Sequence, residues 1–464
     1  TGYGYDPNGN LVSIKYGSLS PVTFGYDALS RRTSMVDAVG TTVWTYDTLG
    51  RLATERGPFG TNVVSVGYDE QGRMTSVSFG SYSATYAIDG KGRITGISAP
   101  EGGYSFSYLE DGFKRTQVMY PNGVKETRGY DALTRMTNLV YKKRLTTLLS
   151  INYRHDNGDR RTNEVWSTGR NLSYGYDRAH QLLSAVSTAR ASDSVNYVFD
   201  KAGNPTSRKE FGLTTAYTFN NLNQFASGSW TGKLTVIGEV NYAAGTVTVN
   251  GVTGKIFPDR VFEATNITVS AGTNVLTAVY HGPAFTNTQM VATNTSSVVV
   301  VNPAFSYDAK GNLTNDAEFV YQYDIANRLT NVISKASGSS VLAARYDGLG
   351  RRVEVTRNAS TVERYVYFPG SFLVLAVLDG SNQIKEVYTQ GPDLSGVVGG
   401  AGGIGGILSV STNIGAASAV KYFHADAMGN VILVSGSDGK QVASYGFTPF
   451  GKLVKQVGDY KARF

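Results

Sequence analysis

The sequence contains no cysteine, only 12 prolines and four histidines among its 464 residues. The absence of cysteine excludes a disulfide scaffold, a thiolate metal site and a cysteine nucleophile. No apolar run reaches the roughly 18 residues of a membrane-spanning helix, and no block of five like charges occurs. The net charge of +7 is therefore spread thinly. This argues against a nucleic-acid-binding surface, which needs basic residues concentrated on one face.

Patterns that could carry catalysis or bind a cofactor are scarce. The histidines His155, His180, His281 and His424 include no i, i+4 pair of the kind that binds zinc on a helix. Gly400 to Gly405 fits Gly-x-Gly-x-x-Gly, but strand-like residues follow where a dinucleotide site requires a helix. Asp6 to Asn10 lacks the spacing and the terminal Glu of a calcium loop. We therefore predict no enzyme activity, no cofactor and no metal.

Glycine and tyrosine are abundant, with 54 and 30 residues, and both recur in one repeated word. The word reads Tyr-Asp-x-x-Gly, then Arg or Asn, then an apolar residue, and copies start 20 to 23 residues apart from Tyr5 to Phe219. Clear copies supply the predicted structural turn residues Tyr5, Asp6, Gly9, Tyr46, Asp47, Gly50, Arg51, Tyr68, Asp69, Gly72, Arg73, Tyr307, Asp308, Gly311, Tyr346, Asp347, Gly350 and Arg351. Weaker copies start at Tyr26, Ile88, Tyr108, Tyr130, Tyr153, Tyr176, Phe199, Phe219 and Tyr323. Such a fixed period indicates a repeat architecture.

Each unit of the repeat is predicted to form one β-hairpin. The residues between words alternate between apolar or aromatic and polar types, as in Thr41 to Tyr46, which is the period of a strand. Within the word, the Asp can accept hydrogen bonds from backbone N–H groups two or three residues on, and the Gly supplies the left-handed conformation of a tight turn. The Tyr, Asp, Gly and Arg of the words are therefore interpreted as structural residues.

Consecutive hairpins are expected to pair into one long antiparallel sheet, because a single hairpin is only marginally stable in water. Tyr and Arg then form ladders across the sheet. Twist between strands and the avoidance of open edges favour a sheet that curls into a spiral shell or partial shell. About fifteen hairpins predict an open half-shell, or one completed by another chain or by further sequence of the same polypeptide. The predicted fold class is all-β.

The repeated words resemble the YD (tyrosine-aspartate) repeats of the Rhs, toxin-complex and teneurin proteins, over roughly residues 1–226 and 303–464. That resemblance implies a hollow β-shell, often with a variable C-terminal toxin inside it. Thr1 to Gly4 opens inside a strand without an initiator Met or a signal peptide, so we expect a piece of a larger polypeptide.

A second similarity lies near the end of the sequence, in a segment that resembles the start of the Rhs core. Its residues are His424, Asp426, Gly429, Pro449 and Gly451. Strand alternation would place His424 and Asp426 on one face, either as a catalytic pair or with the His in a hydrogen bond that fixes the turn before Gly429. Some relatives cut their toxin free with an aspartyl autoprotease in this core. The Asp-Pro-x-Gly boundary expected next is absent, so no cleavage chemistry is assigned.

Residues 227–302 interrupt the repeat. The gap from Phe219 to Tyr307 leaves about 67 residues of extra material, which contains short alternating segments such as Thr246 to Asn250. This segment predicts a small β-sandwich and resembles the immunoglobulin-like modules of bacterial surface proteins. We expect it to protrude outward as a spacer or as a module that binds a glycan or protein.

We therefore predict three parts: a repeat array at 1–226, an inserted module at 227–302, and a continued array with the core-like region at 303–464. The predicted function is a structural shell segment of a large secreted or cell-surface bacterial protein, which encloses or presents a C-terminal, toxin-like region. The alternative is an adhesin that displays the inserted module and has no enclosed cargo. The expected partners are the C-terminal region or a toxin cargo, and a surface glycan or protein bound by the inserted module. We expect no nucleic-acid partner and no membrane span.

Overall fold

The computed structural model describes residues 1–463 except positions 18, 62, 111, 286, 287, 415, 417, 418 and 459. In these ranges the regular elements are strands, apart from one 3-10 turn, η1 (Ala191–Asp193). The all-β prediction is confirmed. No helix in the described ranges is long and apolar enough to span a membrane.

The strands form three sheets. The outer sheet has 22 strands: β1 (Gly2–Tyr5), β2 (Leu11–Lys15), β3 (Val22–Tyr26), β4 (Arg32–Val36), β5 (Thr41–Tyr46), β6 (Leu52–Arg56), β7 (Val64–Tyr68), β8 (Met74–Phe79), β9 (Tyr82–Ile88), β10 (Ile94–Ala99), β11 (Gly102–Tyr108), β12 (Arg115–Met119), β13 (Val124–Tyr130), β14 (Met136–Lys143), β15 (Thr146–His155), β16 (Arg161–Trp166), β17 (Asn171–Tyr176), β18 (Leu182–Val186), β19 (Val195–Phe199), β20 (Pro205–Glu210), β21 (Leu213–Phe219) and β22 (Phe225–Gly232). The inserted unit contains β23 (Leu234–Glu239), β24 (Thr246–Val249), β25 (Val252–Ile256), β26 (Val261–Ile267), β27 (Gly272–Phe285) and β28 (Thr288–Val300).

The inner sheet has 14 strands: β29 (Ser306–Tyr307), β30 (Leu313–Asn315), β31 (Phe319–Tyr323), β32 (Leu329–Ser334), β33 (Ser340–Tyr346), β34 (Arg352–Arg357), β35 (Thr361–Tyr367), β36 (Val374–Asp379), β37 (Ile384–Gln390), β38 (Ile407–Ser411), β39 (Val420–Ala425), β40 (Val431–Ser435), β41 (Gln441–Phe447) and β42 (Leu453–Val457).

In the outer and inner sheets, each strand pairs antiparallel with the next one in the chain. A register shift marks each word: Gly67 pairs with Ser76, but the following Tyr68 pairs with Met74. The shift is a β-bulge, which places one extra residue in the outgoing strand and increases the local twist. A bulge repeated at every word therefore curls the sheet.

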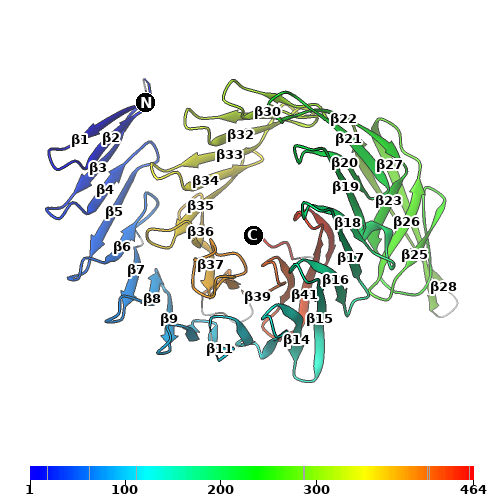
Figure 1. The fold of residues 1–464 in the computed structure, drawn as a ribbon, viewed down its shortest axis with the longest axis horizontal. Coiled ribbons are helices and arrows are strands. Elements are labelled where there is room, and N and C mark those ends of the chain that lie inside the picture. Colours follow the sequence, from blue (N-terminus) through cyan, green and yellow to red (C-terminus); the bar gives the residue numbers. More distant parts are fainter. Residues whose placement is uncertain are drawn as a thin grey trace.

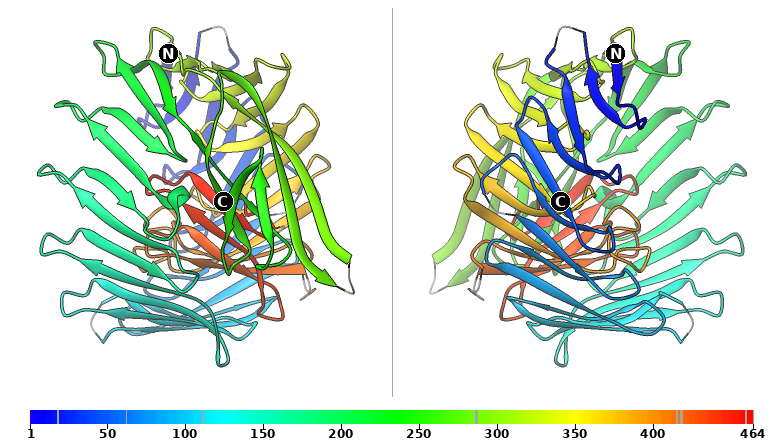
Figure 2. Two further views of the ribbon diagram at one scale, coloured as in Figure 1. Left: turned by 90° about the vertical axis from the view of Figure 1, so that its right-hand side faces the viewer. Right: turned by 90° about the vertical axis from the view of Figure 1, so that its left-hand side faces the viewer.

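The curled sheet winds past its own beginning. Figure 1 shows the outer sheet running from β1 through β9 and β15 to β22, and the inner sheet returning from β30 to lie inside it. Figure 2 shows the hairpins stacked one above another, with their turns projecting at the rims. An isolated bridge between Ser227 and Ala304 joins the end of the outer sheet to the start of the inner one. The predicted curled sheet is confirmed, and it forms a two-layered spiral rather than a single-layered half-shell, because each layer buries the apolar face of the other.

The main hydrophobic core lies between these two layers. Its outer half comes from β7 to β16, with fully buried Leu139 and Ile151, and its inner half comes from β36 to β40, with Leu375 and Leu433. Polar side chains also join the layers. Tyr104 Oη donates to Ser409 Oγ at 2.8 Å, and Asn122 Nδ2 donates to Ser435 Oγ at 2.9 Å.

The inserted unit is a six-stranded antiparallel sheet in the order β23-β26-β25-β24-β27-β28. It folds over a separate core that includes Val249, Ala264 and Ile267, and it lies outside β17 to β22 in Figure 1. Strand β22 continues the repeat array to Gly232, so the first strand of the unit starts at Leu234, later than the predicted boundary at 227. The division into domains and the immunoglobulin-like character stay predictions.

Candidate functional site

The word around Asp47 shows how a repeat turn is built. The Asp47 carboxylate accepts hydrogen bonds from the backbone N–H groups of Leu49 and Arg51 at 2.9 and 2.8 Å. Arg51 Nε donates to the other carboxylate oxygen at 2.7 Å. Gly50 has a φ of +79°, which turns the Arg51 N–H back over the carboxylate. The bonded groups therefore lie two and four residues on, rather than the two or three that the sequence suggested.

Tyr and Arg link each word to the next. Arg51 Nη1 donates to the carbonyl oxygen of Asp69 at 2.7 Å, and Tyr68 Oη donates to the carbonyl oxygen of Leu52 at 2.9 Å. The guanidinium of Arg51 lies 4.8 Å from the centroid of the Tyr68 ring. The same stacking recurs at Arg31 and Tyr46, Arg93 and Tyr108, Arg160 and Tyr176, Arg328 and Tyr346, and Arg351 and Tyr367. Each word thus stabilises its neighbour as well as its own hairpin.

The other clear copies adopt the same turn. The left-handed glycines are Gly9, Gly50, Gly72, Gly311 and Gly350, with φ between +79° and +86°. In the weaker copy at Tyr26, the backbone N–H and the guanidinium of Arg31 also lower the pKa of Asp27 below its usual 3.8, against the opposing effect of burial. The turn carboxylates are therefore engaged in structure.

Several weaker copies keep the turn without a glycine. Ser30, Thr134, His180, Asn223 and Asn327 occupy the glycine position with φ between +58° and +64°. A non-glycine residue in this region carries backbone strain of about 1 kcal/mol or more. The rest of the word therefore imposes the turn.

One copy starts two residues later than predicted. The word assigned to Tyr153 begins at His155, where the Asp156 carboxylate accepts hydrogen bonds from the N–H groups of Gly158 and Arg160 at 2.9 and 3.0 Å. Tyr153 lies inside the long strand β15 and is not followed by an Asp.

Substitution of Gly50 tests the turn directly. We expect Gly50→Val to lower the free energy of unfolding by more than about 1 kcal/mol, because a β-branched residue is strained at positive φ. Gly50→Asn should cost less, since Asn223 and Asn327 adopt this conformation at the same word position. Chemical denaturation of both variants measures the difference, and equal losses would contradict the assigned turn.

In the core-like segment, His424 is fully buried between the two layers. Its Nε2 lies 2.8 Å from Ser435 Oγ, and its ring centroid lies 4.6 Å from that of Tyr120 and 4.9 Å from that of Tyr141. Burial lowers the pKa of His424 to about 3. The imidazole is therefore neutral at physiological pH and acts as a core residue.

Asp426 has a different environment, because it is the Asp of another repeat word. Its carboxylate accepts hydrogen bonds from the N–H groups of Met428 and Asn430 at 2.8 and 2.9 Å, and Gly429 has a φ of +86°. Strand β39 ends at Ala425, so Asp426 lies in the turn and the alternation of the strand does not extend to it. Among the described residues no hydrogen bond or ion pair joins His424 to Asp426, so the structure does not bring the candidate pair together.

Pro449 and Gly451 belong to one further turn of the same type. Thr448 replaces the Asp, with its Oγ1 accepting a hydrogen bond from the Lys452 N–H at 3.1 Å, and Gly451 has a φ of +81°. The core-like residues thus continue the repeat pattern.

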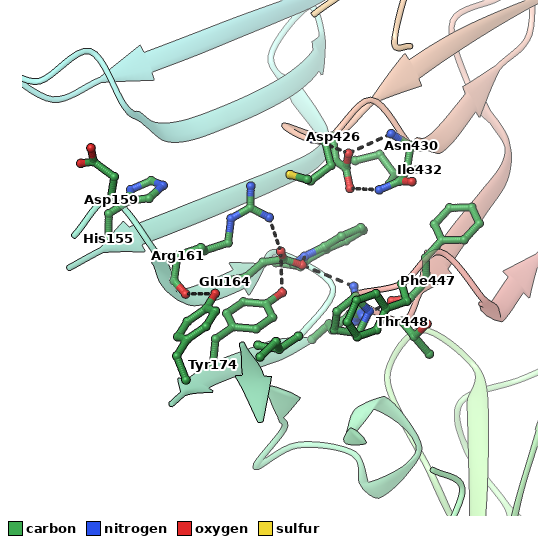
Figure 3. A pocket seen from close by; sticks show the side chains of 17 residues that line it. His155, Asp159, Arg161, Glu164, Tyr174, Asp426, Asn430, Ile432, Phe447 and Thr448 are labelled. Atoms are coloured by element: carbon green, nitrogen blue, oxygen red, sulfur yellow. Dashed lines mark hydrogen bonds and ion pairs between the residues drawn. The ribbon is translucent and has the colours of Figure 1, made fainter. Parts of the chain in front are cut away.

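A pocket of about 490 Å³ lies between β16 to β18 and the two turns that contain Asp426 and Thr448. Figure 3 shows Arg161 and Glu164 facing Asp426 across it, with Tyr174 below. Burial raises the pKa of Asp426 above its usual 3.8. The pocket combines carboxylates, guanidinium groups and aromatic rings, the side chains from which an acid–base site could be made.

The polar groups of the pocket, however, bind one another. Glu164 accepts from Tyr174 Oη at 3.1 Å, from Arg161 Nη1 at 3.2 Å, from Arg170 Nη1 at 3.4 Å and from Trp166 Nε1. Four donors match the acceptor capacity of a carboxylate. Glu164 therefore has no free lone pair to take up a substrate proton.

Arg170 extends this network to the inner sheet, where its Nη2 donates to the carbonyl oxygen of Phe447 at 2.7 Å. The arrangement is a polar joint between the two layers. Glu164 and Arg170 were not identified from the sequence. The pattern that could have indicated Glu164 is its spacing of two from Trp166, which places both side chains on the inward face of one strand. In the described part of the chain, no group of three or more His, Cys, Asp or Glu side chains is placed to hold a metal ion.

In comparisons with known proteins, residues 13–141 match the family model described as Teneurin YD-shell. The chain is 29% identical over 242 residues to the tRNA3(Ser)-specific nuclease WapA of Bacillus spizizenii, which covers 50% of this chain and 9% of that protein. It is 30% identical over 171 residues to the tRNA(Glu)-specific nuclease WapA of Bacillus subtilis subsp. natto, covering 36% and 7%. The match spans less than a tenth of the length of these relatives.

Two solved structures are also similar. The Tc holotoxin pore of Photorhabdus luminescens is 12% identical, with 98% of this chain and 24% of that chain covered and a TM-score of 0.45. TcdB2-TccC3 without its hypervariable C-terminal region is 11% identical, with 99% and 25% covered and a TM-score of 0.43.

Proposed function

We propose that this chain, a YD-repeat protein as its sequence predicted and the family match confirms, is a wall segment of a larger shell. The wall encloses or presents the region that follows residue 463. In this proposal the chain is a structural scaffold of a secreted or cell-surface bacterial protein and performs no catalysis itself.

The position of the C-terminal residues carries the proposal. They lie near the centre of the spiral in both Figure 1 and Figure 2. Arg463 Nε and Nη2 donate to the two carboxylate oxygens of Glu386 at 2.8 and 3.0 Å, and its Nη1 donates to Glu363. Burial alone would raise the pKa of Glu363, but the Arg463 guanidinium and neighbouring cations lower it to about 2. A chain that continues beyond this anchor would begin inside the wall.

The curated relatives fit this arrangement. Their names describe tRNA nucleases, and the match to this chain covers only 9% and 7% of the length of these two relatives. We assign such an activity, in the whole protein, to a toxin-like region outside this chain, with the spiral as its container.

A second candidate function is a binding scaffold. A groove of about 540 Å³ opens in the inserted unit between β23 and β28, and Val236, Val240, Tyr280 and Asn294 line part of it. An adhesin that displays this groove would need no enclosed cargo, and its ligand would be a surface glycan or protein.

Size-dependent labelling distinguishes the two functions. Because the chain has no cysteine, Lys461→Cys and Leu49→Cys each create one reactive thiol, near the centre and at a rim turn respectively. Both positions are exposed to water. We expect a small maleimide to label both, and a 5-kDa polyethylene-glycol maleimide to label Leu49→Cys at least about tenfold faster. Equal rates with the large reagent would contradict enclosure and favour the scaffold.

A further inference from the structure

We infer that the inserted unit is a clasp, which holds the last hairpin of the inner sheet in place and so controls the position of the segment beyond it. The part about the following segment rests on the proposed function; the clasp itself rests on contacts within this chain.

The clasp centres on Asp259, in the turn between β25 and β26. Its Oδ1 accepts from Arg190 Nη2 at 2.7 Å, and its Oδ2 accepts from Lys455 Nζ. Arg190 precedes η1 in the outer sheet, and Lys455 lies on β42 of the inner sheet. One carboxylate from the inserted unit therefore joins a cation from each of the two layers.

The joint is shielded from water. Arg190 is 4% exposed, and the side chains of Asp259 and Lys455 are 18% and 15% exposed. Burial lowers the pKa of Lys455, and its bond to Asp259 opposes that shift. Low exposure strengthens the ion pairs and makes the loss of one partner costly.

Other contacts orient the clasp. Glu263 on β26 accepts hydrogen bonds from the backbone N–H groups of Ala191 and Ser192, which fixes η1 against the unit. Asp193 lies 3.5 Å from Arg170 Nε, so the joint continues into the polar network behind the pocket. The inserted unit is thus docked at this point rather than free.

Removal of the Asp259 charge would take away the carboxylate that bonds to both Arg190 and Lys455. Asp193, which attracts both cations, is shared with Arg170. Like charges held close together repel, and little water is present to screen them.

Among the described residues, β42 pairs with β41 and with no second strand. Besides Lys455, the residue before β42 also ties it to the outer sheet, because Lys452 Nζ donates to Glu210. The residues from Tyr460 to Arg463 come shortly after β42 in the chain, so Asp259 helps to hold this end of the inner sheet in place, together with the bonds from Arg463 to Glu386.

Hydrogen exchange of the variant Asp259→Asn tests the clasp. We expect the amides of β42 and η1 to exchange at least about tenfold faster, with those of β39 and β40 unchanged. Glu239→Gln is the matched control, because Glu239 pairs with Arg260 in the same unit at a more exposed site, and it should leave β42 unchanged.

A second variant covers the case in which Asp259→Asn fails to fold. Lys455→Met removes the other partner, and we expect it to raise exchange in the β25–β26 turn and in β42. The double variant should add little to the stronger single one. Exchange of β42 within twofold of the native rate in every folded variant would overturn the clasp. Labelling at position 461 tests enclosure separately, so the two proposals fail in different experiments.

Discussion

Replacement of Arg351 by alanine is expected to lower the free energy of unfolding by about 3–5 kcal/mol. Arg351 belongs to a repeat word of the inner sheet, and its Nη1 lies 2.7 Å from Glu55 Oε1 of the outer sheet. Its Nε lies 2.7 Å from the carboxylate of Asp347, and the three side chains are at most 6% exposed. Without Arg351, two carboxylates would remain buried without a cation.

Arg51→Ala is the matched control for this variant. Arg51 has the same position in its word and the same bond to its own Asp, but its side chain is 26% exposed. Its ion pair should contribute at most about 1 kcal/mol, as exposed pairs do. Chemical denaturation of both variants measures the difference. Similar losses of unfolding free energy in the two variants would show that the contact of Arg351 with the other layer adds no stability beyond that of the repeat turn.

The second large effect is on the pH dependence of stability. His424 has a pKa of about 3 in the folded chain because it is buried, whereas an exposed histidine has a pKa of about 6.5. As the pH falls from about 6.5 towards 3, the unfolded chain therefore binds a proton that the folded chain does not. Stability falls by about 1.4 kcal/mol per pH unit over this window, to a total of about 4–5 kcal/mol.

His424→Gln isolates this contribution, because glutamine can still bond to Ser435 but does not titrate. We expect the difference in unfolding free energy between native chain and variant to shrink or reverse as the pH falls from 7 to 4. A native slope in His424→Gln would mean that His424 is already accessible to protons in the folded chain.

The repeat turns could be predicted because all their determinants lie within one word. Asp47, Gly50 and Arg51 are near neighbours in the chain, and residue type alone dictates the turn. The copy at His155 was misplaced because an alternating strand also supplied a tyrosine at Tyr153. The sequence in this region is therefore compatible with a word that starts at either Tyr153 or His155.

Contacts between the layers could not be predicted. Tyr82 Oη lies 2.9 Å from Thr389 Oγ1, across 307 positions in the chain, and no periodic signal specifies which hairpins meet. The buried state of His424 and the role of Glu164 depend on that meeting. The sequence therefore indicated a curled sheet, but neither its second layer nor the polar joint between the layers.

The chain winds into a spiral whose second sheet lies inside the first (Figure 1). Ala38 and Arg345 test it, because Arg345 Nη2 donates to the Ala38 carbonyl oxygen at 2.8 Å and both residues are exposed. A short bis-maleimide should cross-link Ala38→Cys to Arg345→Cys within one chain, as read by mass spectrometry of the joined peptides. The pair Leu49→Cys and Arg345→Cys should take up the reagent without forming the intramolecular link. Equal labelling of positions 38 and 345 with no joined peptide would contradict the spiral.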